Sequence, residues 1–238
     1  MVSQTRFYQR HWHSVLLAIF TSMLLASSTL WAGVFGHRQA PEHAERGVGI
    51  LPAMAEPHGY SLEDLAKVTA AFNVSDHSLP PELVNGSRHS KFQMLFTTMD
   101  NTFHVRPNTI LYVPVLTFDD SPPVIGKFPK IRDREAVLRY VFSAKQVGLQ
   151  YSILAIDGQD FPLEEKYLVA VKVPPLPDGG GTGYMVSAAF VKPLKKGSHE
   201  VVISGSITGD AVGPWCGDLG FACPDGVSFA VTYNVIVD

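Results

Sequence analysis

FHVRPNTILYVPVLTFDDSPPVIGKF, residues 103–128, joins the most apolar strand pattern of the chain to its densest acidic and proline cluster. Residues 109–117 are rich in β-branched and aromatic side chains and almost continuously apolar, which predicts a strand buried on both faces. Pro114 cannot donate to a strand ladder, so we expect it at a sheet edge or in a bulge. Arg106, Pro107 and Asn108 predict a turn before the strand.

Asp119 and Asp120 follow this strand, on a loop stiffened by Pro122 and Pro123. Loops at strand ends often carry functional groups, so both carboxylates are candidate ligand-binding residues. Side chains of adjacent strand residues point to opposite sides, so the two would cooperate only if the loop bends. Solvated carboxylates at a capped strand end are the structural alternative, and a calcium shell is not favoured because no D-x-D-x-D-G loop is present.

Composition indicates one folded domain behind an N-terminal segment that does not join its core. The chain has 238 residues, of which 46% are hydrophobic, enough for a core of ordinary size. Its net charge is −3, and it becomes −5 without residues 1–32, which argues against a nucleic-acid partner.

Residues 1–32 read as a secretory signal peptide, since Arg6 and Arg10 precede the apolar run 15–26. The alternative is an uncleaved anchor over 15–36, which has no charged residue and is long enough to cross a bilayer. Both predict a folded part outside the cytoplasm, either secreted or periplasmic, with membrane contact only through that segment. Residues 33–59 predict a poorly ordered arm, and residues 60–238 the β-domain. His37, His43 and His58 fit no known ligand spacing, so no metal site and no cofactor are expected.

Two helices and a hairpin are predicted around the central stretch. Ser61 with Asp64 forms a capping box for a helix with one apolar side, and Asp133 can cap a second helix through about Phe142. Residues 91–97 and 102–105 flank the Asp100-Asn101 turn and read as a hairpin. The arginines of the second helical region are a solvated face or, less favoured, a site for an acidic ligand; they are Arg132, Arg134 and Arg139.

The C-terminal third reads as strands. Strands are expected over 184–194, 199–207 and 227–237, and the last alternates from Val227 to Val237. Residues 178–181, DGGG, form a loop and not a phosphate cradle, because neither a lysine nor a helix pattern follows. Cys216 and Cys223 enclose six residues and predict one disulfide in an oxidising compartment.

Four segments carry a resemblance to a group of exported bacterial proteins of unknown function. They are 105–115 for a V-P-A-G-x-x-L-F-F-P-V strand, Ile156-Asp157-Gly158 for an I-D-G turn, and 197–205 with 229–235 for a G-x-H-x-V and F-x-V-x-Y-x-V-x-V strand pair. The chain departs from this pattern at 106–108 and at the acidic pair 119–120. The resemblance covers roughly residues 103–238 and implies a β-sandwich, and it brings no activity and no site residue.

The fold expected is therefore mainly β: an antiparallel β-sandwich, jelly-roll or immunoglobulin-like, with one or two short helices. The first functional hypothesis is a non-enzymatic binding or structural module of the cell envelope or secretome, with carbohydrate or envelope proteins as partners. Phe118 and Trp215, taken as exposed, would stack on sugar faces beside Asp119 and Asp120. The alternative is a secreted hydrolase or lyase that uses Asp119 and Asp120 with His104 or His199.

Overall fold

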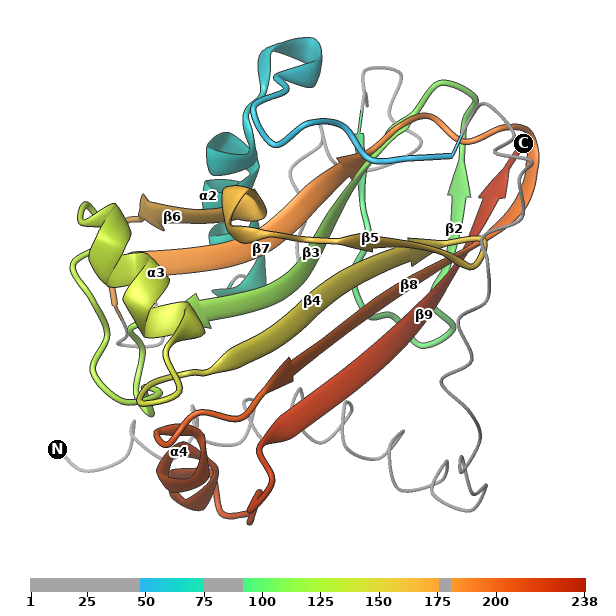
Figure 1. The fold of residues 1–238 in the computed structure, drawn as a ribbon. Coiled ribbons are helices and arrows are strands. Elements are labelled where there is room, and N and C mark those ends of the chain that lie inside the picture. Colours follow the sequence, from blue (N-terminus) through green and yellow to red (C-terminus); the bar gives the residue numbers. More distant parts are fainter. Residues whose placement is uncertain (1–47, 75–91, 176–180) are drawn as a thin grey trace, which may run out of the picture. The chain divides into compact units, whose positions relative to one another are not determined.

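The computed structural model describes residues 48–74, 92–175 and 181–238, and these form a β-sandwich of two sheets (Figure 1). The predicted signal peptide and the first part of the predicted arm lie outside the described residues. The four-stranded sheet has the order β1-β3-β7-β6, and the five-stranded sheet has the order β2-β9-β8-β4-β5. The strands are β1 (Phe92–Met94), β2 (Thr102–Val105), β3 (Ile110–Asp119), β4 (Leu149–Ile156), β5 (Gln159–Pro162), β6 (Leu168–Lys172), β7 (Gly183–Val191), β8 (Gly197–Ile207) and β9 (Val227–Val237).

The predicted central strand is β3, which lies between β1 and β7 and is buried along most of its length. Its apolar run is continuous because both of its faces are covered, as the pattern predicts. Pro114 lies beyond the residues of β3 that pair with β1, and the register between β3 and β7 shifts between Pro114 and Leu116. The position therefore agrees with both expected solutions, an edge of the sheet and a bulge. Asn108 has φ 67° in the turn before β3, where asparagine is tolerated.

The predicted hairpin of residues 91–97 with 102–105 is wrong. β1 pairs in parallel with β3 in one sheet, whereas β2 pairs in parallel with β9 in the other, so the Asp100-Asn101 turn carries the chain from sheet to sheet. Alternation identifies a strand and its buried face, but it carries no information on the partner strand. All other strand pairs are antiparallel, so each sheet is antiparallel apart from one edge pair.

Part of the predicted disordered arm is ordered. Ile50 forms a bridge with Val191, and the N–H of Leu51 donates to the carbonyl of Phe190 at 2.8 Å. β6 pairs only with the first half of β7, so residues 49–51 continue the sheet edge beside the second half. The arm expected over 33–59 is therefore wrong for residues 48–59, because the apolar pair Ile50 and Leu51 fills a strand edge that would otherwise be open.

Helix α2 (Leu62–Val74) covers the outer face of the four-stranded sheet. Its capping box is confirmed: the N–H of Asp64 donates to Ser61 Oγ, and the N–H of Ser61 donates to Asp64 Oδ2 at 3.2 Å. The helix buries one side, including Leu62 and Leu65, and Thr69 Oγ1 lies 3.1 Å from the hydroxyl of Tyr112 on β3. The result is three layers: a helix, a four-stranded sheet and a five-stranded sheet.

Helix α3 (Arg134–Phe142) closes one end of the sandwich (Figure 1). Asp133 caps it as predicted, with its side chain accepting from the N–H of Ala136 at 3.0 Å. Val137, Tyr140 and Val141 are buried in a second apolar cluster. Two short 3-10 helices, η1 (Pro57–Gly59) and η3 (Glu165–Tyr167), and helix α4 (Val212–Asp218) complete the described structure. None of the helices in the described ranges has the length and apolar character needed to cross a membrane.

Candidate functional site

Asp119 and Asp120 both bond to backbone N–H groups at the end of β3. Asp119 Oδ1 accepts from the N–H of Ser121 at 2.8 Å, which fixes the turn out of the strand. Asp120 Oδ1 accepts from the N–H of Gly183 at 2.8 Å, and the N–H of Asp120 donates to the carbonyl of Gly183 at 3.3 Å. The Asp120 carboxylate therefore holds the end of β3 to the start of β7, whereas the Asp119 carboxylate holds the turn that leaves β3.

A pocket of about 320 Å³ opens beside Asp120, and we call it the strand-end pocket. It is lined by Asp120, Phe128, Pro129, Lys130, Ile131, Arg132, Lys172, Thr182 and Gly183. These residues come from four places: the end of β3, the segment before α3, the end of β6 and the start of β7. The strand-end pocket thus joins positions up to 63 residues apart in the sequence.

The floor of the strand-end pocket is apolar and tightly packed. Phe128 and Ile131 are half-buried, and the ring of Phe128 meets the ring of Tyr140 edge to face at 5.4 Å between centroids. Gly183 is required beneath them, because an added Cβ would lie 2.7 Å from Phe128 Cε1 and 2.9 Å from Ile131 Cγ1. The absence of a side chain at Gly183 lets the Phe128 ring and the Ile131 side chain lie directly against β7.

The rim of the strand-end pocket is cationic. Lys130, Arg132 and Lys172 are exposed, and none of them forms an ion pair with a carboxylate in the part of the chain that the structure describes. Among the described lining residues, Asp120 is the only carboxylate. Three cations face one carboxylate in a protein whose net charge is −3, so the local potential opposes the overall charge.

Phe118 and Trp215 do not form the exposed aromatic surface that the sequence suggested. Phe118 is 7% exposed and belongs to the apolar cluster under α3, with its ring 6.3 Å from that of Tyr140. Trp215 is half-buried on α4, and its indole N–H donates to the carbonyl of Pro123 at 3.0 Å. The expectation of exposure was wrong for Phe118 because β3 continues through Asp119, so that Phe118 still belongs to the inward-facing row.

Sequence reasoning missed Phe128, Lys130 and Lys172, and it favoured a solvated face for Arg132. A signal was present in Lys127-Phe128-Pro129-Lys130-Ile131-Arg132, where basic and apolar residues interleave directly after the acidic loop. Arg134, two residues further on, is not available for a ligand. Its guanidinium donates to the carbonyls of Leu168, at 2.6 Å, and Glu165, and so ties α3 to the start of β6.

The predicted disulfide is confirmed. Cys216 on α4 is bonded to Cys223, with the two Cα atoms 6.1 Å apart. The bridge holds α4 against the loop that leads to β9, and Trp215 and Phe221 meet edge to face inside the same loop. It therefore stabilises the element that packs on Pro123, near the loop that carries Asp119 and Asp120.

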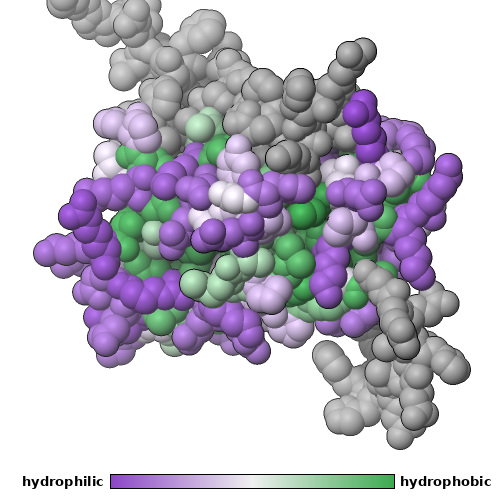
Figure 2. All heavy atoms as spheres, turned by 90° about the horizontal axis from the view of Figure 1, so that it is seen from above, coloured by the Kyte–Doolittle hydropathy of each residue, from purple (hydrophilic) through white to green (hydrophobic). Residues whose placement is uncertain are grey.

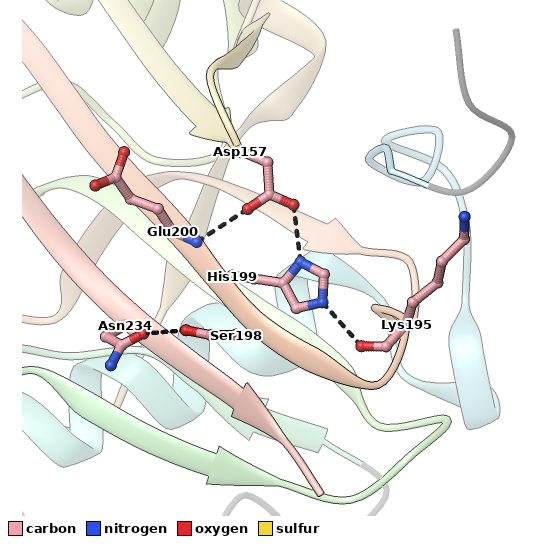
Figure 3. A network of polar contacts seen from close by, with 6 residues as sticks. All are labelled: Asp157, Lys195, Ser198, His199, Glu200 and Asn234. Atoms are coloured by element: carbon pink, nitrogen blue, oxygen red, sulfur yellow. Dashed lines mark hydrogen bonds and ion pairs between the residues drawn. The ribbon is translucent and has the colours of Figure 1, made fainter.

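His199 takes part in a separate polar network at the opposite end of the sandwich (Figure 3). Its Nδ1 lies 2.8 Å from Asp157 Oδ2, and its Nε2 lies 2.8 Å from the carbonyl of Lys195. Burial lowers the pKa of His199, but the hydrogen bonds to Asp157 and Lys195 and the Asp157 charge outweigh it, so the pKa is raised above its ordinary value of 6.5. Both ring nitrogens face acceptors, an arrangement that only the doubly protonated imidazolium satisfies.

The structure brings neither His104 nor His199 to Asp119 and Asp120. Asp119 pairs with Tyr184 at the start of β7, whereas Lys195 and His199 follow the last residue of that strand, Val191. Seven residues of strand separate these ends by about 23 Å. His104 instead lies 3.3 Å from Asp238 at an exposed position. The grouping required by the hydrolase or lyase hypothesis is thus not assembled. In the described residues, no three of the His, Cys, Asp and Glu side chains are close enough to hold a metal ion.

A second depression, of about 500 Å³, lies beside residues 50–54 and has a mainly apolar lining with Lys166 and Lys192. Lys166 is already paired with Glu164 at 2.7 Å. On the face seen from above the view of Figure 1, hydrophobic areas lie among the hydrophilic side chains (Figure 2). The second depression therefore offers less unneutralised charge than the strand-end pocket.

Comparison with known proteins gives no family. No family model matches the chain, and no curated protein matches it. Two solved structures are similar at low identity. A cysteine protease inhibitor, EhICP2, from Entamoeba histolytica is 13% identical, with a TM-score of 0.29, over 62% of this chain and 96% of its own. Amebosin is 11% identical, with a TM-score of 0.26, over 61% of this chain and 97% of its own. Similarity at this level carries no information on function.

Proposed function

We propose that the chain is an exported, non-enzymatic binding module that holds an anionic ligand in the strand-end pocket. The observation that carries this proposal is the convergence of Lys130, Arg132 and Lys172 on one pocket, where Asp120 is the only carboxylate among the described lining residues. Lysine and arginine without a partner at a concave surface attract anions, and the walls of a pocket strengthen that attraction.

Two features support export. The apolar run 15–26 follows Arg6 and Arg10, as in a secretory signal peptide. The Cys216–Cys223 bridge needs an oxidising compartment, which in a bacterial cell lies outside the cytoplasm. A fusion of residues 1–60 to alkaline phosphatase, which is active only after export, tests this part. Replacement of Leu16 and Leu17 by Asp should abolish the phosphatase activity, and unchanged activity would contradict the export proposal.

A binding role is supported over catalysis by what the carboxylates do. Asp119 and Asp120 each have an oxygen that accepts from a backbone N–H, and neither His104 nor His199, the two histidines proposed as their partners, lies beside them. General acid and base catalysis requires both groups within hydrogen-bonding reach of one substrate. The strand-end pocket has charge and shape, but no such pair.

The test is a thermal-shift titration of the full chain, purified with its disulfide, against citrate at low salt. A ligand at 100 times its dissociation constant stabilises by about 2.7 kcal/mol, or roughly 5 to 10 °C for a domain of this size. We expect the shift to fall with added NaCl and to disappear in a Lys130→Ala/Lys172→Ala double variant. Lys196→Ala is the matched control, because Lys196 is an exposed lysine on the β7–β8 turn at the other end of the sandwich. An equal shift in the double variant and the control would refute the proposal.

A further inference from the structure

The strand-end pocket combines an apolar floor, a carboxylate and a cationic rim, and a simple anion needs only the last of these. We propose, building on the proposed function, that its ligand is an acidic oligosaccharide in which a sugar residue carries a carboxylate, as in a uronate. Each surface then has a partner on one sugar ring: the C–H face, the hydroxyl groups and the carboxylate.

The apolar floor accounts for the ring. Phe128 is half-buried and held in place by Tyr140 and by the close approach of Gly183. A pyranose presents a face of C–H groups that packs on an aromatic ring and removes apolar area from water. Inorganic phosphate or sulfate has no such face, so neither ion would cover the exposed apolar surface of Phe128 and Ile131. The floor therefore favours an organic ligand.

Asp120 accounts for the hydroxyls. Its Oδ1 accepts from Gly183, and an ionised carboxylate has further lone-pair positions for other donors. Sugar hydroxyls are donors and satisfy these positions. A compact dianion placed at the same point would be repelled by the carboxylate instead. Asp120 therefore selects a ligand whose donor groups and negative charge are on different atoms.

The cations account for the carboxylate. Arg132 presents a planar guanidinium whose paired N–H groups match the two oxygens of a carboxylate. Lys130 and Lys172 are point charges on the same rim and suit carboxylates on neighbouring sugar residues. The volume of about 320 Å³ is at the lower end of small-molecule sites, which fits one sugar residue inside and its neighbours at the rim.

The experiment is isothermal titration of the full chain with trigalacturonate, its fully methyl-esterified form and inorganic phosphate. The methyl ester keeps the rings and hydroxyls and loses the charge. We expect trigalacturonate to bind at least about tenfold more tightly than either of the other two ligands. The methyl ester cannot form the charge-assisted contact, and phosphate has no sugar ring to pack on the floor.

Four variants separate the contributions, and a fifth is the control. Arg132→Ala should weaken trigalacturonate binding about tenfold or more. If Arg132→Ala lowers the melting temperature, Lys172→Ala tests the cationic rim in its place. Phe128→Leu keeps an apolar floor, loses the aromatic face and should weaken trigalacturonate without changing phosphate. Asp120→Asn keeps an acceptor for Gly183 and should weaken trigalacturonate while strengthening phosphate. Lys196→Ala should bind like the wild type.

The outcomes distinguish the two proposals. Phosphate or citrate binding as tightly as trigalacturonate, with Phe128→Leu and Asp120→Asn unchanged, overturns the acidic-sugar ligand and leaves the anion-binding function standing. Absence of binding by trigalacturonate, phosphate and citrate overturns both.

Discussion

Replacing His199 by Gln should destabilise the protein relative to the wild type, and this loss of stability should be greater at pH 5.5 than at pH 8.5. In the folded state the imidazolium donates from Nδ1 to Asp157 and from Nε2 to the carbonyl of Lys195 (Figure 3). The pKa of His199 is raised above its ordinary value of 6.5, so the folded protein binds this proton more tightly than the unfolded chain does. The resulting stabilisation is complete below pH 6.5 and is lost as the pH rises through the folded pKa.

The loss of stability expected for His199→Gln depends on how exposed His199 and Asp157 are to solvent. The side chain of His199 is 12% exposed and that of Asp157 is 38% exposed. Fully exposed ion pairs contribute about 0.2 to 1 kcal/mol, whereas buried hydrogen bonds to charged groups contribute about 1.5 to 3 kcal/mol. A partly exposed pair lies between these limits, so we expect about 1 kcal/mol. With a urea m-value of about 2 kcal/mol per molar, the unfolding midpoint of the variant should be lower by about 0.5 M at pH 5.5.

The assay is urea unfolding of wild type and His199→Gln, monitored by tryptophan fluorescence at pH 5.5 and pH 8.5. The other histidines are present in both proteins, so the difference between the two proteins isolates His199. His104→Gln is the matched control, because its contact with Asp238 is exposed on both sides and should contribute little at either pH. A His199→Gln deficit that is the same at both pH values, or greater at pH 8.5, would show that the network does not depend on the imidazolium.

Three further changes test the fold. Replacing Cys216 and Cys223 by Ala opens a loop of eight residues and should cost about 2.5 kcal/mol in the chain-entropy estimate, measured by urea unfolding; an unchanged midpoint would contradict it. Tyr112→Phe removes a fully buried hydroxyl that lies 3.1 Å from Thr69 and should lower the melting temperature by about 2 to 4 °C, for a loss of about 1 kcal/mol. Ser61→Ala removes the capping box of α2 and should cost about 1 kcal/mol, whereas Ser61→Thr should retain most of it; equal losses would argue against the cap.

Several local features of the fold could be predicted because the residues that decide them are close in the sequence. Ser61 and Asp64 are three residues apart, Asp133 caps the helix that follows it, and Cys216 and Cys223 are separated by seven positions. The continuous apolar run of β3 and the alternation of β9 identified buried strands, because burial on one or two faces imposes a period on the chain.

The candidate site could be predicted only in part. Asp120 was recognised because a strand ends there, and it does line the strand-end pocket. Phe118 was misplaced because the exact end of a strand is weakly encoded, and one more paired residue turns an exposed side chain into a buried one. Lys172 could not be linked to Asp120, since they are brought together only where β6 and β3 flank β7.

Local sequence was enough to predict the fold class, the helix caps, the bulge-prone strand and the disulfide, since each depends on neighbouring residues or on a period along one element. Tertiary structure alone decided that β1 and β2 belong to different sheets, that Ile50 and Leu51 complete the edge of β7, and which basic residues converge on the strand-end pocket. The physical reason is that periodicity specifies which face of a strand is buried, whereas the choice of partner depends on the packing of the whole sandwich.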